Sequence, residues 1–198
     1  MQILTALYDS FGIATQIVRD LESADVARSA ISIIANTGGD QRIAASEPSD
    51  MTGATTGASA GAVLAGGAGL LAGLGMIAIP GMGPLVAAGW LASTAAGAAA
   101  GGVAGGLLGA LVEGGVGSED APVFAESVRR GATFVSVRAG EDQVPLVRAI
   151  LYREGHVDPV ARGAEYRALG WTGFEDGGAP YPAAAPAGSL KNWPETLV

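Results

Sequence analysis

The 198-residue sequence contains no cysteine and a single histidine, His156, and these absences exclude several kinds of protein. Without cysteine there is no disulfide framework, no thiolate metal site and no cysteine nucleophile. One histidine does not build a multi-histidine metal centre. Basic residues are also few, with 11 Lys and Arg against 19 Asp and Glu, and the formal net charge of −8 argues against nucleic acid as a partner.

Charged residues are missing altogether from Met51–Val112, which we call the charge-free stretch. Its 62 residues include 17 glycines and 18 alanines, whereas all 30 charged residues lie in the rest of the chain. The beginning of the chain lacks a basic start followed by an apolar run, and Asp9 interrupts it early. We therefore expect a location in the cytoplasm or on the cytoplasmic face of the inner membrane.

The N-terminal flank, residues 1–50, has the pattern of a β-α-β unit. Gln2–Tyr8 is mostly apolar and Ile31–Ala35 is rich in β-branched residues, so both are predicted to be strands. Ser10 is a candidate cap for a helix between them. The apolar positions of that helix share one face: Phe11, Ala14, Ile17, Val18 and Leu21.

The C-terminal flank, residues 118–171, repeats the pattern. A short helix with Pro122 in its first turn is predicted to stop at Gly131, and Thr133–Arg138 alternates like a strand. The elements expected after it are a helix over Glu141–Glu154, a short strand at His156-Val157, and a helix over Ala161–Leu169 capped by Asp158. Residues 172–198 are rich in proline and are predicted to form an extended tail.

Two β-α-β halves predict an α+β fold, a ferredoxin-like sheet with helices on one face. Residues 51–117 would interrupt it as a long helical hairpin, because Pro80-Gly81-Met82-Gly83-Pro84 breaks the charge-free stretch in two. The predicted helices are Ala58–Ile79 and Leu85–Val112. At about 33 and 42 Å each would be long enough to cross a bilayer core of roughly 30 Å.

Small residues recur every fourth position in both predicted helices. Because residues four apart share a helix face, such stripes let two helices approach closely, as in a glycine zipper. The candidate helix-packing residues are Gly57, Gly61, Gly69, Gly73, Gly89, Gly97, Gly101, Gly105 and Gly109. Glycine disfavours an isolated helix, so packing or lipid must supply stability. A flexible Gly/Ala linker is the alternative.

Other residues offer chemistry, and for each a structural role is the simpler interpretation. Asp9-Ser10 is more typical of a helix cap than of an anion site, and His156 lacks a nucleophile pattern around it. Arg129-Arg130 is a weak candidate for lipid headgroups. The acidic pairs Glu119-Asp120 and Glu141-Asp142 suit helix starts. We expect no catalytic residue, metal site or cofactor.

Several short motifs along the chain carry a resemblance to known proteins. They are Ala6-Leu7-Tyr8-Asp9, Val135-Ser136-Val137-Arg138, Ala149-Ile150-Leu151, Gly155-His156-Val157-Asp158, Glu165-Tyr166-Arg167 and Gly170-Trp171. Over about residues 3–171 the chain resembles one bacterial family, the heat-induced or general stress proteins. The resemblance implies a β-α-β unit joined to a glycine-zipper insert, stress association and membrane contact, and it implies no catalytic residues.

Two hypotheses about function follow. The first is a non-enzymatic, self-assembling structural protein whose glycine-zipper hairpins pack between subunits, either in a membrane or in a wholly soluble homo-oligomer. Its partners are copies of itself and membrane lipid. The second is a ligand-sensing ferredoxin-like module anchored by the hairpin. The spacing of the small residues favours the first, and the sequence names no ligand for the second.

Overall fold

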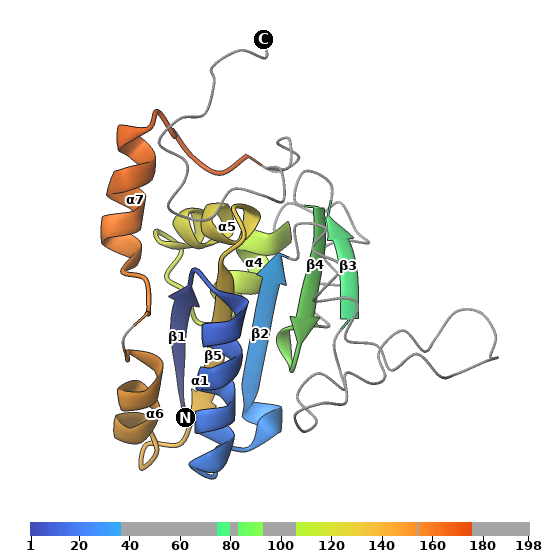
Figure 1. Cartoon of the computed structure of the whole chain (residues 1–198), viewed down its shortest axis with the longest axis vertical. Helices are drawn as coiled ribbons and strands as arrows, with labels where there is room; N and C mark the ends of the chain where they lie inside the picture. The colour runs from blue at the N-terminus through green and yellow to red at the C-terminus, as the bar shows by residue number, and fades with distance from the viewer. Residues whose placement is uncertain (37–74, 80–82, 93–105, 154, 176–198) are drawn as a thin grey trace, which may run out of the picture.

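The computed structural model describes residues 1–36, 75–79, 83–92, 106–153 and 155–175. Five strands form one antiparallel sheet in the order β1-β5-β2-β4-β3 (Figure 1). The strands are β1 (Gln2–Tyr8), β2 (Ile31–Asn36), β3 (Gly75–Ile79), β4 (Gly83–Ala88) and β5 (Thr133–Ala139). The chain is therefore a mixed α and β protein, as the sequence predicts.

The N-terminal β-α-β unit is confirmed. Helix α1 (Phe11–Ser23) connects β1 to β2, and β5 lies between these two strands, antiparallel to both. The buried residues of α1 are those of the predicted apolar stripe, apart from Phe11, which is partly buried: Ala14, Ile17, Val18 and Leu21. Ser10 occupies the N-cap position with extended backbone, but its side chain makes no capping hydrogen bond.

The C-terminal elements also appear in the predicted order. They are α5 (Ala121–Arg129), β5, α6 (Val144–Leu151) and α7 (Pro159–Ala168). The expected short strand is a single bridge, in which His156 pairs with Tyr8 on the outer side of β1. Asp158 caps α7 by accepting a hydrogen bond of 2.9 Å from the backbone N–H of Val160. Helix α6 is shorter than predicted.

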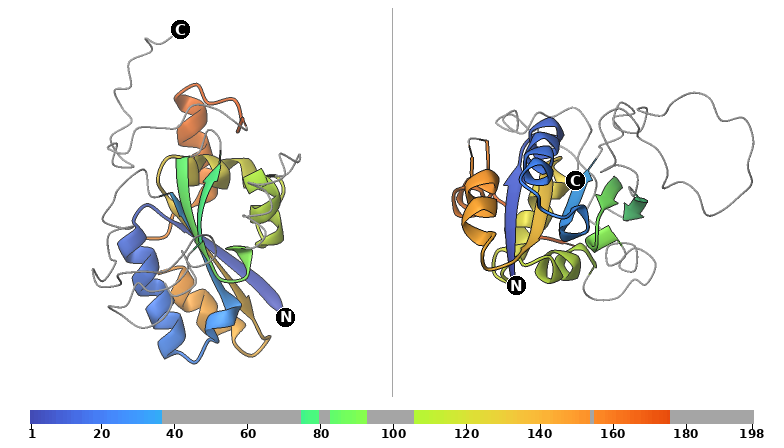
Figure 2. Two further views of the ribbon diagram at one scale, coloured as in Figure 1. Left: turned by 90° about the vertical axis from the view of Figure 1, so that its right-hand side faces the viewer. Right: turned by 90° about the horizontal axis from the view of Figure 1, so that it is seen from below.

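Helices cover both faces of the sheet, so the prediction of helices on one face was wrong. Helices α1 and α6 pack on one face, whereas α4 (Gly106–Glu113) and α5 pack on the other (Figure 2). Both faces of the central strands can be buried because two of their buried serines form hydrogen bonds in the interior. Ser136 donates to the carbonyl of Gly114 at 2.6 Å, and Ser32 donates to that of Ala88 at 2.7 Å.

The predicted helical hairpin over residues 51–117 needs the largest correction. Strand β3 occupies the end of the first predicted helix and β4 the start of the second, so neither helix forms over its full length. The two strands pair antiparallel, and β4 joins the sheet through β2. The apolar residues on either side of residues 80–83 satisfy their backbone groups by extending the sheet. Of the described residues, α4 and the pair Leu91-Ala92 keep the predicted helical form; residues 51–74, 80–82 and 93–105 lie outside the described ranges.

Candidate functional site

Two of the nine candidate helix-packing glycines lie in described parts of the chain. Gly89 is not helical: its φ is +84°, in the turn that follows β4. A Cβ atom there would lie 2.2 Å from the carbonyl oxygen of Ile31, so glycine permits close approach within one chain and not between helices. Gly109 lies in α4, is exposed, and would give a Cβ atom no neighbour within 4 Å.

The other seven candidate glycines lie outside the described residues: Gly57, Gly61, Gly69, Gly73, Gly97, Gly101 and Gly105. The glycine stripe is therefore visible at one point only, the exposed position of Gly109 on α4. A small exposed residue on a helix surface leaves room for a second backbone to approach.

Strand β3 forms one edge of the sheet and belongs to the charge-free stretch. Its sequence, Gly75 to Ile79, contains neither a charged residue nor a proline. Among the described residues β4 is its only partner strand, which places β3 at the end of the strand order (Figure 1). Edge strands commonly carry lysine, proline or a bulge that discourages pairing with other strands. Neither lysine nor proline is present here.

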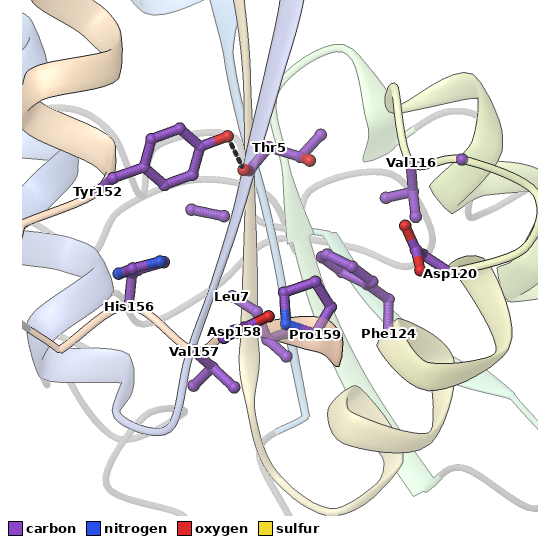
Figure 3. A pocket seen from close by; sticks show the side chains of 12 residues that line it. Thr5, Leu7, Val116, Asp120, Phe124, Tyr152, His156, Val157, Asp158 and Pro159 are labelled. Carbon is purple, nitrogen blue, oxygen red and sulfur yellow. Dashed lines mark hydrogen bonds between the residues drawn. The ribbon is translucent and has the colours of Figure 1, made fainter. Parts of the chain in front are cut away.

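A cavity of about 170 Å³ lies beside the opposite edge of the sheet, at β1 (Figure 3). Its walls come from the Thr5–Leu7 segment of β1, the start of α5, and the segment between α6 and α7. The Tyr152 hydroxyl donates to the Thr5 carbonyl at 3.1 Å, and Val157 N–H donates to the Leu7 carbonyl at 2.8 Å. These two bonds hold the loop that carries His156 against β1.

The charged side chains that line this cavity are carboxylates. Asp120 and Asp158 contribute them, His156 lies beside Tyr152 with ring centroids 5.3 Å apart, and no lysine or arginine lines the cavity. Asp158 is already engaged as the cap of α7, whereas Asp120 makes no capping hydrogen bond at α5. The arrangement suits a neutral or positively charged small molecule better than an anion.

Arg129 and Arg130 are not available to lipid, which corrects the headgroup interpretation. Their side chains are 9% and 11% exposed and both contact the fully buried carboxylate of Glu126. The guanidinium of Arg130 stacks 4.3 Å from the ring centre of Tyr166 on α7, and that of Arg129 lies 5.3 Å from the ring centre of Phe174. The pair therefore joins α5 to α7 and to the segment that follows it.

Asp9 forms an ion pair that sequence spacing does not reveal. Both of its carboxylate oxygens accept hydrogen bonds from Arg162, each at 2.8 Å, across 153 positions of the chain. Hydrogen bonding to Asp9 raises the pKa of Arg162 further above its already high value. Asp9 is thus committed to fixing α7 near the end of β1, and the anion-site interpretation of Asp9-Ser10 finds no support in this pairing.

Comparisons with protein-family models, with curated proteins and with solved structures find no match for this chain. In the part of the chain that the structure describes, no three His, Asp or Glu side chains are grouped so that they could hold a metal ion. Over the same residues, every helix is too short or too polar to cross a membrane.

Proposed function

We propose that this protein is a non-enzymatic, self-associating structural protein and that the charge-free stretch mediates contact between its copies. The observation that carries the proposal is that part of this stretch forms an uncharged edge of the described sheet, at β3. A sheet edge offers unpaired backbone groups to another chain, and β3 has no charge or proline to discourage this.

The distribution of charge supports the same contact. The chain carries a net charge of −8, and all of its charged residues lie outside Met51–Val112. Two copies that approach through their flanks therefore repel each other, whereas two that meet through the charge-free stretch keep their charges apart. The stretch is the part of the chain best suited to contact with another copy.

We further propose that the core belongs to the ferredoxin-like class. In support, β5 lies between β1 and β2, and β1 lies between β5 and the His156 bridge. The β1-α1-β2 unit and the unit formed by β5, α6 and the bridge therefore interleave. The fourth strand of such a fold would be reduced here to that bridge. The β3–β4 hairpin and α4 would then be additions contributed by the insert.

Gly109 offers a test of glycine packing between copies that spares the fold of one chain. Because a Cβ atom at this exposed position meets nothing within 4 Å, Gly109→Leu should fold, and leucine favours helix over glycine by roughly 0.8 kcal/mol. We expect light scattering of the full chain to give a smaller mass for Gly109→Leu than for the wild type. Gly109→Ala, which keeps a small residue, should retain the wild-type mass.

Each outcome of this experiment bears on a different part of the proposal. A wild-type mass of one chain at every concentration would rule out self-association. A wild-type assembly that Gly109→Leu leaves unchanged would exclude the glycine stripe of α4 from the contact. Adding phospholipid vesicles to the same samples shows whether the protein binds lipid as well.

A second candidate function is the binding of a small ligand, and the cavity beside β1 favours it. Its volume of about 170 Å³, its aromatic side chains and its two carboxylates suit a small organic cation. We expect propylammonium to shift the NMR signals of His156 and Tyr152, and Asp120→Asn to weaken that response. Equal shifts with acetate, or none with propylammonium, would count against a cation site.

The resemblance to bacterial general stress proteins adds stress association to the proposal. It rests on the short motifs in residues 3–171 and has no support from the comparisons. An increase in the amount of this protein after heat shock is the expected result, and a constant level would remove this part of the proposal.

A further inference from the structure

We propose that β3 of one copy pairs antiparallel with β3 of a second copy, so that two five-stranded sheets become one continuous sheet across a two-fold axis. This inference rests on the self-association proposed above and specifies its geometry. It follows from which backbone groups point out of the sheet, which edge of the sheet is closed, and where the charge lies.

The hydrogen-bonding pattern of the sheet identifies the outward backbone groups of β3. Along an antiparallel strand, successive residues direct their N–H and C=O groups to opposite sides of the strand. On β1 the carbonyls of Thr5 and Leu7 point away from β5, since Tyr152 and Val157 donate to them. The alternation can be followed through the registers β1–β5, β5–β2, β2–β4 and β4–β3. It ends with Met76 and Ala78 facing outward from β3.

Pro84 leads to the same assignment independently. It lies opposite Ala78 in the β3–β4 register and has no N–H to donate. The Ala78–Pro84 pair is therefore of the type that exchanges no backbone hydrogen bonds, and Ala78 directs its own N–H and C=O away from β4. Two separate observations thus agree on which groups of β3 are open.

This parity restricts the register between two copies, and full overlap of the five residues of β3 then selects the one centred on Ile77. If Ile77 lies on the two-fold axis, Met76 lies opposite Ala78 of the partner subunit, and Ala78 opposite Met76 of the partner subunit. Both pairs then consist of outward-facing residues and together make about four backbone hydrogen bonds. A shift by one residue would place outward groups opposite inward ones, so the strand is complementary to itself in this register.

The strand that pairs with β3 comes from a second copy of the chain, because the described part of the sheet has one open edge and that edge is uncharged. The β1 edge is covered by the loop that donates to Thr5 and Leu7. At β3, by contrast, neither the strand nor β4 carries a charged residue, so two such hairpins meet without the repulsion that a net charge of −8 produces elsewhere.

Proline and valine at position 78 test the pairing, with the full chain in sedimentation experiments. Ala78→Pro removes an outward N–H that the chain's own hairpin does not use, and proline is tolerated at the solvent side of an edge strand. We expect it to weaken dimerisation at least about tenfold, since each dimer loses two backbone hydrogen bonds. The matched variant Ala78→Val keeps the N–H and should change the dissociation constant less than about threefold.

Amide hydrogen exchange gives a second measurement that does not depend on the proline variant folding. In the wild-type dimer the amides of Met76 and Ala78 should be protected, and on dilution to the monomer they should exchange fast while Ile77 stays protected. Protection of Met76 and Ala78 in the monomer would overturn the inference, because the chain itself would then cover the edge. Fast exchange at both residues in the dimer would overturn it too.

The outcomes separate this inference from the function on which it rests. A wild-type protein that stays monomeric refutes self-association altogether. A wild-type assembly that Ala78→Pro leaves as tight as Ala78→Val refutes edge pairing and leaves self-association standing. Selective loss of association in Ala78→Pro, with unchanged circular dichroism, supports both.

Discussion

At the scale of single residues, Tyr8 shows how a polar group is buried between β1 and α6. Its side chain is fully buried, and its hydroxyl donates to the carbonyl of Leu151 at 2.6 Å. Burial is the main cause that raises its pKa above the ordinary 10.0, and the nearby Tyr152 adds to it. The folded protein therefore keeps this hydroxyl protonated at pH values where the unfolded chain begins to lose the proton.

This difference predicts a loss of stability in alkaline solution. Below pH 10.0 the Tyr8 hydroxyl is protonated in both the folded and the unfolded state, and its contribution to the free energy of unfolding is complete. That contribution falls as the pH rises toward the higher pKa of the folded state. Above pH 10 the free energy of unfolding of the wild type should fall more steeply than that of Tyr8→Phe, by up to about 1.4 kcal/mol per pH unit. Urea denaturation at several pH values measures both slopes; parallel curves would contradict the assignment.

Tyr8→Phe also has a cost at neutral pH that serves as an internal check. The variant keeps the ring but leaves the Leu151 carbonyl without its hydroxyl donor, so we expect it to lose about 1 kcal/mol. A variant as stable as the wild type at neutral pH would show that this hydrogen bond contributes little.

At the scale of elements, the sequence predicts best those segments whose signals are local. The stripe of α1, the Asp158 cap of α7 and the glycine stop at Gly131, with φ of +102°, each depend on neighbouring residues and are confirmed. A cap or an amphipathic stripe acts within one or two turns of a helix, so tertiary packing seldom overrides it.

The helix prediction was wrong for Gly75–Ile79 and Gly83–Ala88 because a four-residue spacing does not distinguish helix from strand. Residues four apart share a face of a helix, but they also share a face of a strand, whose side chains alternate with a period of two. The β-branched residues next to the Gly/Pro break, such as Ile77, Ile79 and Val86, were the signal for strands. Gly89 shows the consequence, because it serves a turn against β2.

The join between α5 and α7 depends on the buried Glu126 and its two arginines. Removing the negative charge would leave Arg129 and Arg130 buried beside a neutral side chain. We expect Glu126→Gln to lower the free energy of unfolding by about 3–5 kcal/mol, measured by chemical denaturation. Glu165→Gln is a suitable control: the Glu165 side chain is 68% exposed, and losing its 3.3 Å ion pair with Arg162 should cost less than about 1 kcal/mol. Equal losses would contradict this account of the cluster.

At the scale of the whole molecule, the features that sequence could not predict are those that join distant segments. The Asp9–Arg162 pair spans 153 positions, and the cavity beside β1 takes residues from three separate parts of the chain. The spacing of neighbouring residues does not predict contacts between such distant segments. The second helical layer was missed for the same reason, since α4 and α5 pack on the far face of the sheet only once β5 lies between β1 and β2.

The same scale shows why an acidic chain would associate at all. Its charges lie on the flanks, and its uncharged stretch supplies both the open strand β3 and the exposed Gly109. The proposed association would therefore combine an apolar and backbone component at the contact with a repulsive component between the flanks. Salt weakens the second without removing the first, because screening acts on charges in solvent.

Sedimentation velocity of the full chain, over a range of protein and salt concentrations, tests the central claim most directly. We predict a mass of two or more chains at high protein concentration, with tighter association as ionic strength rises from about 0.01 to 0.15 M, where the screening length falls from about 30 to about 8 Å. A single-chain mass throughout, or an assembly that salt dissociates, would contradict contact through the charge-free stretch.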